Sequence, residues 1–406
     1  MTGQHTPAHG TLRGAALLPQ PDGEVEFLPH AEIAWQDGRF TAIRALPTPR
    51  ATDAPLLLPG FVDLHCHWPQ SHVRGQFSGQ LLPWLRESIW PAEAAFRDLG
   101  LAQQRADAFL ADVTRAGTCA GLFFGAPFAE ATAVFLNATP EGFFEGPAIM
   151  SQNAPETLLR PAETTLELLR ALNHPRVAIA PRFAPNVDAA GLAACGEAAR
   201  ATDWPVQSHL AENGEELAWV HALFPDARDY TDVYDRAGLL GPRTVMAHGI
   251  HLSDRELARL AEAQTLIAHC PTSNEALGSG RMPLERLRRA EVPWVLATDV
   301  GAGPSLSQLH VMQRFLATHA GHADARATEA LARATAIPGA WLAQFDPKLA
   351  GLGTLAVGAP AHLVALPLRP DGEDAPEALL RAILTRAADA FEHLPVAVVR
   401  WGIAVV

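Results

Sequence analysis

The chain has 406 residues, of which 48% are hydrophobic and 18% are charged, so it can bury a large core and is not intrinsically disordered. Its formal net charge is −13 with no basic stripe to offset it, which excludes binding to a nucleic-acid backbone or to an anionic membrane. The only lysine is Lys348, in a late Asp-Pro-Lys turn, and this excludes phosphate loops, Schiff-base catalysis and carboxylated-lysine metal bridges.

The N-terminal stretch, MTGQHTPAHGTLRGAALLPQ, lacks the charged leader and the apolar region of a signal peptide. No apolar run approaches the roughly 18 residues that a membrane span requires. We therefore expect a cytoplasmic protein with no membrane partner.

The two ends of the chain have β-like patterns. Residues 1–58 contain the runs AEIAW and RFTAI around a Gly-containing turn, and residues 346–406 contain HLVAL, AVVRW and IAVV. We predict that both ends form one small β-sandwich-like domain, the alternative being two unrelated β appendages. The acidic run at 371–374 predicts a solvated loop.

Between the ends, short apolar strands alternate with Ala/Leu/Arg/Glu-rich segments of helical periodicity. The predicted strands are 61–67, 117–123, 147–153, 176–183, 205–209, 244–248, 265–270 and 293–299. The clearest predicted helices are 101–116, 187–202, 253–263 and 283–290. Strand followed by helix, eight times, predicts an α/β fold whose residues 59–345 form a (β/α)8 TIM barrel.

Polar side chains end several of these strands, and in such barrels the carboxyl ends of the strands form the active site. The first strand ends in His65-Cys66-His67, where the two-residue period of a strand turns both imidazoles to one side. His209 and His248 end the fifth and sixth strands, and Asp299 ends the eighth. Histidines and a carboxylate that converge from separate strands predict a metal site.

Each feature alone has a plainer interpretation. His65 and His67 could be core histidines that satisfy their own hydrogen bonds. Glu212, three residues after His209, could be a helix-start carboxylate favoured by the helix dipole, and Asp299 could be an N-cap. Their joint occurrence on four strands favours the metal site.

At the level of motifs, the sequence resembles the amidohydrolase superfamily, in its mononuclear zinc deaminase branch, and within it the enzymes that deaminate guanine. The resemblance covers residues 56–345. It rests on PGFVDLHCHWPQ, LLPWLRESIWPAEAAF, NAPE, PRF, QSHLAEN, YTDVYDRAGLL, MAHGIHLS, AHCPTSN and ATDVGAG. The fourth predicted strand ends in Arg182, where two-metal branches usually carry a lysine, so one metal ion per subunit is expected.

The resemblance implies hydrolytic deamination of guanine to xanthine and ammonia in a homodimer. It implies one Zn²⁺, with Fe²⁺ as an alternative, held by His65, His67, His209 and Asp299. His248 would lie beside the water that the metal activates, and Glu212 would be the proton shuttle. His209 and Glu212 would also contact the substrate. Gln70, Arg182 and Phe183 would hold the purine.

Three competing interpretations stay open. The first is a deaminase of the same branch that acts on another oxopurine, a pterin or a triazine. The second is an amide- or chloride-releasing hydrolase on the same scaffold. The third is a metal-binding protein without catalysis, which the presence of both Glu212 and Asp299 disfavours.

Overall fold

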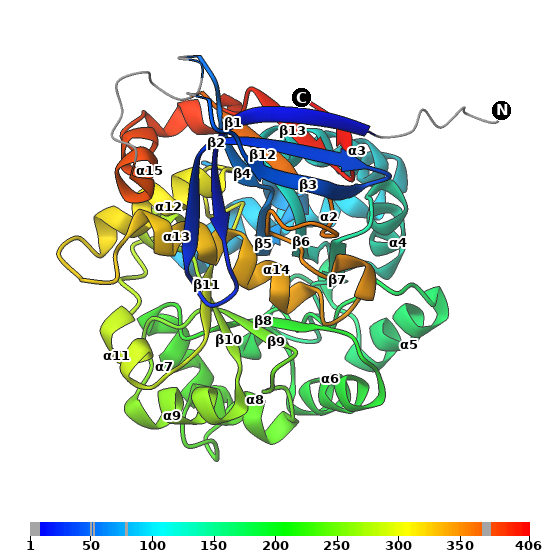
Figure 1. Ribbon diagram of the computed structural model, residues 1–406. Coiled ribbons are helices and arrows are strands. Elements are labelled where there is room, and N and C mark those ends of the chain that lie inside the picture. The colour runs from blue at the N-terminus through cyan, green and yellow to red at the C-terminus, as the bar shows by residue number, and fades with distance from the viewer. Residues whose placement is uncertain (1–8, 49–50, 52, 78–79, 368–374) are drawn as a thin grey trace. The chain divides into compact units, whose positions relative to one another are not determined.

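The computed structural model describes residues 9–48, 51, 53–77, 80–367 and 375–406 (Figure 1). The predicted acidic loop at 371–374 lies outside them. Contacts within the chain divide it into two compact units. The first comprises residues 1–63, 111–121 and 305–406, and the second comprises 64–110 and 122–304.

Strands from both ends of the chain share one seven-stranded sheet in the first unit, as the β patterns at the two ends predict. Its order is β14 (Ile403–Ala404), β13 (Ala397–Arg400), β12 (Leu363–Leu366), β4 (Leu56–Pro59), β1 (His9–Pro19), β2 (Val25–Gln36) and β3 (Arg39–Ala45). In Figure 1 the blue strands of the N-terminal end lie beside the orange and red strands of the C-terminal end.

The join between the two chain ends is antiparallel, with Val364 of β12 opposite Leu58 of β4. The indole Nε1–H of Trp35 donates to the carbonyl of Gly402 at 2.8 Å, which ties β2 to the C-terminal strands. Asp37 and Gly38 form the two-residue turn between β2 and β3, both with positive φ, so the predicted Gly-containing hairpin is present. The helices of this unit are α12 (Gln308–Thr318), α13 (Ala327–Ala334), α14 (Ala336–Leu342), η6 (Pro347–Leu349), α15 (Pro376–Leu384) and η7 (Ala388–His393).

The barrel strands form two hydrogen-bonded groups, and the strands of the second group are parallel. One is β5 (Phe61–His67), β6 (Thr118–Gly125) and β7 (Phe143–Pro147), and the other is β8 (Val206–Leu210), β9 (Thr244–His248), β10 (Leu266–His269) and β11 (Trp294–Leu296). Segment 177–181 bridges the groups through isolated parallel pairs with Glu145, Ile149 and Val206. The amide of Asp299 donates to the carbonyl of His65 at 2.9 Å, which closes the ring. The fold is therefore the predicted α/β barrel.

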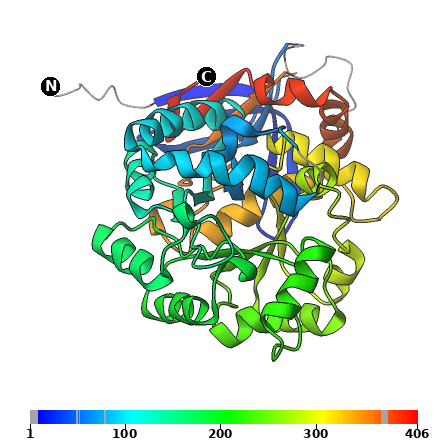
Figure 2. The ribbon, with the colours of Figure 1, turned by 180° about the vertical axis from the view of Figure 1, so that it is seen from behind.

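Helices follow these strands on the outside, and Figure 2 shows the green ones from behind. They are η1 (Trp68–Val73), α1 (Leu81–Trp84), η2 (Leu85–Ile89), α2 (Trp90–Ala94), η3 (Ala95–Arg97), α3 (Leu99–Arg115), α4 (Ala129–Ala138), η4 (Glu156–Leu158), α5 (Ala162–Leu172), η5 (Ala184–Asn186), α6 (Ala189–Ala201), α7 (Gly214–Leu223), α8 (Tyr230–Ala237), α9 (Asp254–Ala263), α10 (Pro271–Ala276) and α11 (Leu284–Arg289). Among the described residues, none of the helices combines the length and apolar character that a membrane crossing requires.

Two strands differ from their predicted positions, and the eighth, expected at 293–299, is shorter than predicted, at Trp294–Leu296. The third was expected at 147–153, but β7 occupies Phe143–Pro147 and carries a buried glutamate, Glu145. This strand is difficult to recognise in the sequence because it contains the charged Glu145 and Gly146 and follows Gly142. The fourth, expected at 176–183, forms only isolated bridges, because Pro181 has no N–H to donate to a ladder. The domain boundaries 1–58 plus 346–406 and 59–345 stay a prediction.

The packing of α6 against α8 gives a test of the barrel's outer layer. A Cβ added at Gly196 would lie 1.7 Å from the carbonyl oxygen of Ala237, which is backbone and cannot move cheaply. Gly196→Ala is expected to lower the free energy of unfolding by roughly 2 kcal/mol or more. Denaturant titration measures this, with Gly214→Ala as control, because nothing lies within 4 Å of its added Cβ. Equal stability of Gly196→Ala and the parent would contradict the close packing.

Candidate metal centre and active site

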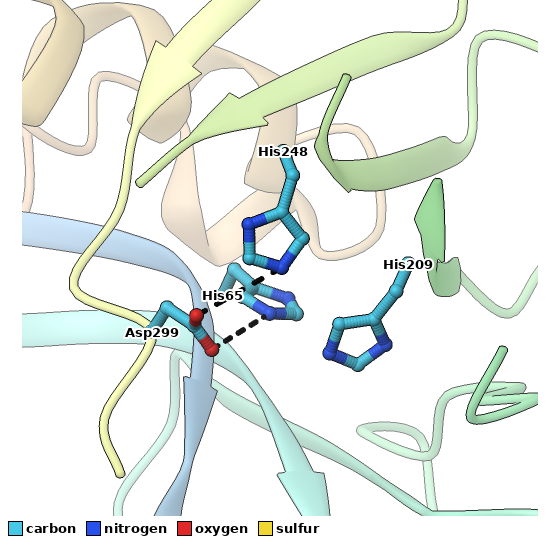
Figure 3. A group of neighbouring side chains, drawn as sticks. All are labelled: His65, His209, His248 and Asp299. Atoms are coloured by element: carbon cyan, nitrogen blue, oxygen red, sulfur yellow. Dashed lines mark ion pairs between the residues drawn. The ribbon is translucent and has the colours of Figure 1, made fainter. Parts of the chain in front are cut away.

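Five side chains of types that can ligate a metal meet at the carboxyl ends of the barrel strands. His65 and His67 come from β5, His209 from β8 and His248 from β9, and Asp299 follows β11. Figure 3 shows the rings of His65, His209 and His248 and the carboxylate of Asp299 turned toward one another. Within this set, one ligand atom from each of these four residues lies within 4.8 Å of the others.

His67 belongs to the same cluster by its distances. Its Nε2 lies 3.1 Å from Nε2 of His209 and 3.5 Å from Oδ1 of Asp299. His65 Nε2 lies 3.2 Å from the same carboxylate oxygen, whereas His248 Nε2 is 3.8 Å from Oδ2 of Asp299. His67, a predicted ligand, therefore contacts two members of the group of four but is not itself in that group, whereas His248 is; the ligand set His65, His67, His209 and Asp299 stays a prediction.

Hydrogen bonds to the second ring nitrogen orient two of these histidines. Nδ1–H of His209 donates to the carbonyl of Arg182 at 2.5 Å, which leaves Nε2 to face the cluster. Nδ1–H of His248 donates to Oδ1 of Asn274 at 2.9 Å. Such partners fix the tautomer and the ring direction, as is usual around protein-bound metals.

The protonation states suit a metal. Burial lowers the pKa of His65, and lowers those of His67 and His209 well below the ordinary value, so these imidazoles are neutral. Burial opposes ionisation of Asp299, but its hydrogen bond to His65 and the nearby imidazoles hold its pKa well below the usual range. Neutral imidazoles with an ionised carboxylate are the forms that bind divalent ions, and this donor set fits zinc or iron.

The backbone is strained at this centre. Ala211, His248 and Asp299 all have positive φ, of 51°, 72° and 49°. Left-handed conformations of residues other than glycine cost about 1–3 kcal/mol each and cluster at functional sites. Here they turn the chain just after β8, at the end of β9 and after β11.

Glu212 lies beside the cluster as a buried carboxylate. Its Oε1 accepts a hydrogen bond from Ser279 Oγ at 2.9 Å, and its Oε2 lies 3.4 Å from Nε2 of His248. Burial, opposed by His248 and assisted by the charges of Asp299 and Glu216, raises the pKa of Glu212 to about 7. For His248 burial acts to lower the pKa, but Glu212 and Asp299 outweigh it and raise that pKa. Glu212 is thus poised to exchange a proton near neutral pH.

A pocket of about 410 Å³, open solvent included, lies over the cluster. Its lining residues are His67, Gln70, Leu81, Trp84, Leu85, Arg182, Phe183, His209, Glu212, Glu216, His248, Leu277, Asp299 and Ala302. One part of the wall is apolar, built on the α1–η2 segment together with Phe183 and Leu277. The lining therefore includes all five residues predicted to bind the substrate, which are Gln70, Arg182, Phe183, His209 and Glu212.

Sequence reasoning missed two supporting carboxylates, Glu93 and Glu216. Glu93, on α2, is buried and contacts both Arg182 and Gln70. Glu216 accepts from the amide of Glu212 at 2.9 Å and from the hydroxyl of Tyr230 at 2.7 Å. Glu93 could have been identified from the sequence, because it lies inside the apolar run IWPAEAAF and a buried charge requires polar partners. His269, at the end of β10, lies outside the group of four and contacts Trp294 instead.

Comparison with known proteins agrees with this geometry. A family model described as "Amidohydrolase family" matches residues 56–396. The chain is 37% identical to a probable guanine deaminase of Deinococcus radiodurans over 341 residues, 77% of this chain and 76% of that one. It is 35% identical to the guanine deaminase of Escherichia coli K12 over 312 residues, 74% and 69% of the two chains. A solved structure, "E. coli Guanine Deaminase", superposes with a TM-score of 0.87 at 26% identity and 99% coverage of both chains.

Proposed function

The chain belongs to the amidohydrolase family, and we propose that within it this protein catalyses the hydrolytic deamination of guanine to xanthine and ammonia. The observation that carries the proposal is the position of Glu212. This buried carboxylate lines the same pocket as Arg182 and Gln70, and its Oε2 lies 3.4 Å from Nε2 of His248 in the histidine–aspartate cluster. The similarity to guanine deaminases over about three quarters of the chain supports the choice of substrate.

We propose that His65, His67, His209 and Asp299 hold one divalent ion per chain, which we take to be zinc, with iron as the alternative. When bound, such an ion supplies a Lewis acid that makes water a nucleophile at neutral pH. We further propose that the protein is a cytoplasmic homodimer with a free purine base as its small-molecule partner.

Residues of the protein carry out the proton transfers of this proposed reaction. Asp299, ionised before the reaction, accepts a proton from the attacking water, while His248 orients that water. Glu212 in its protonated form donates to a ring nitrogen of guanine, N3, which makes C2 electrophilic. A bond forms from the water oxygen to C2, a proton passes to the amino group through Asp299 or Glu212, and the C2–N bond breaks to release ammonia. Positioned proton transfer contributes about 10²–10⁴-fold to the rate.

Incubating the purified protein with guanine tests this function. Ammonia and xanthine should form in equal amounts, with metal analysis on the same sample. Weak action on adenine and cytosine is expected, because pocket groups that pair with guanine would be left unpaired, a loss of roughly 10⁴-fold. Ammonia from another oxopurine, a pterin or a triazine, but not from guanine, would overturn the substrate assignment. Comparable turnover of adenine and guanine would contradict the pocket assignment.

Arg182→Ala is expected to lower kcat/KM for guanine by roughly 10²-fold, mainly through KM, because a charged donor to the substrate is lost. Metal content should stay at the parent value, since only the backbone carbonyl of Arg182 contacts a proposed ligand, His209. Steady-state kinetics and metal analysis check both. Arg86→Ala, exposed on the segment that lines the pocket, is the control. Unchanged kinetics in Arg182→Ala would remove this residue from substrate binding.

A further inference from the structure

A buried carboxylate joins the two polar residues of the pocket wall. Glu93 is 0% exposed, and its Oε1 accepts from Gln70 Nε2 at 2.7 Å and from Arg182 Nη1 at 2.9 Å. Its Oε2 accepts from the same Nη1 at 2.6 Å. The side chains of Gln70 and Arg182 are also buried, so the three groups form one unit away from bulk water.

Glu93 decides which way the amide of Gln70 faces. An ionised carboxylate only accepts hydrogen bonds, so the group turned toward it must be the Nε2 amine. The opposite end, Oε1, accepts from the amide N–H of Gly301 at 3.3 Å. Both ends of the amide are thus assigned, and the hydrogen-bonding capacity that remains on Nε2 is a second N–H donor.

Arg182 is constrained in the same way. Both contacts with Glu93 come from Nη1, and the guanidinium is planar, so anchoring this atom limits the plane in which Nη2 and Nε lie. A guanidinium has no acceptor. The groups that these two side chains have left to offer a bound base are therefore mainly N–H donors, because one of the two lone pairs of Gln70 Oε1 is already used by the Gly301 amide.

We propose that Glu93 is a positioning residue that holds Gln70 and Arg182 with their N–H donors available to the pocket and thereby selects an oxo group over an amino group at C6 of the purine. The inference rests on the proposed function and deepens it. An oxo group accepts from this wall, whereas an amino group would set N–H against N–H and leave buried donors unpaired. Glu93 itself does not line the pocket and acts through its two partners.

Glutamine at position 93 removes this constraint. Its amide can donate as well as accept, so Gln70 can turn around and present Oε1 to the pocket, and Arg182 loses its charge partner. Aspartate keeps the charge at a shorter reach. Glu93→Gln should therefore weaken the preference for an oxo group, and Glu93→Asp should restore part of it.

Hypoxanthine and adenine are the probes, because they differ at C6 and neither carries the amino group at C2 that the proposed reaction removes. Calorimetric titration of the metal-loaded parent should give tighter binding of hypoxanthine by roughly 10²-fold or more. In Glu93→Gln this ratio should fall by roughly 10-fold or more, with KM for guanine raised and kcat changed much less. Glu87→Gln, exposed on the same segment, loses the same charge and should behave as the parent.

The outcomes separate the two claims. A parent that releases no ammonia from guanine overturns the proposed function, and the binding ratio still decides the role of Glu93. If Glu93→Gln keeps the parent's hypoxanthine-to-adenine binding ratio and its KM for guanine, the positioning role is overturned. A lower melting temperature with an unchanged binding ratio also overturns it, because a purely structural role would give that result. If Glu93→Gln does not fold, Gln70→Leu supplies the test, because it removes the oriented amide while keeping the Glu93–Arg182 pair. A hypoxanthine-to-adenine binding ratio in Gln70→Leu equal to that of the parent would also overturn the inference.

Discussion

Glu212→Gln is expected to abolish ammonia release while the metal stays bound. Glutamine matches glutamate in size and can keep the hydrogen bond from Ser279, but it cannot donate and recover a proton. The loss of positioned proton transfer should lower kcat by roughly 10³–10⁴-fold. Glu212 is not among the proposed ligands, so one ion per chain should remain. Initial rates of xanthine formation and elemental analysis on the same preparation measure both.

The neighbouring Glu215→Gln provides the matched control. Glu215 is exposed at the start of α7 and is not one of the residues that line the pocket. This variant should keep the parent's kcat and metal content. If Glu212→Gln stayed nearly as active as the parent, the shuttle would be another group. If it lost its metal together with its activity, Glu212 would act as part of the metal centre.

The donor cluster could be predicted from sequence because it depends on a rule of backbone geometry. The two-residue period of a strand turns His65 and His67 to one side, and the carboxyl ends of barrel strands meet at one rim. His209, His248 and Asp299 needed only to be recognised as the ends of their strands. This inference holds even when the predicted strand ends are wrong by a residue or two. The difference between the predicted and observed positions of β7 did not affect it, because β7 contributes no residue to the cluster.

The supporting residues could not be predicted in the same way. Glu93 reaches Arg182 and Gln70 from a short helix after a π-helical turn, and no periodicity relates that helix to the strands. Asn274 orients His248 from α10, a contact between elements whose spacing the sequence does not reveal. Glu145 made β7 difficult to recognise, because its burial depends on Trp68, whose indole Nε1–H donates to it at 3.2 Å. These side chains are positioned by contacts in three dimensions rather than by local pattern.

Removal of the metal should have an effect as large as loss of the proton shuttle. A Lewis acid supplies several kcal/mol of transition-state stabilisation, and 4 kcal/mol corresponds to roughly 10³-fold in rate. Chelation of the parent should therefore abolish ammonia release, and one equivalent of zinc should restore it. Chelation should also lower the melting temperature, because a ligand that binds only the folded chain stabilises it.

His65→Ala distinguishes loss of this centre from a general effect of the chelator. His65 Nε2 lies 3.2 Å from Asp299, so the variant loses a proposed ligand and a close neighbour of a second one. It should lack both metal and activity, and added zinc should not restore either. His221→Ala, which removes an exposed histidine of α7, should keep both. One equivalent of tightly bound zinc in His65→Ala would show that His65 is not needed to hold the ion and would contradict its place among the proposed ligands.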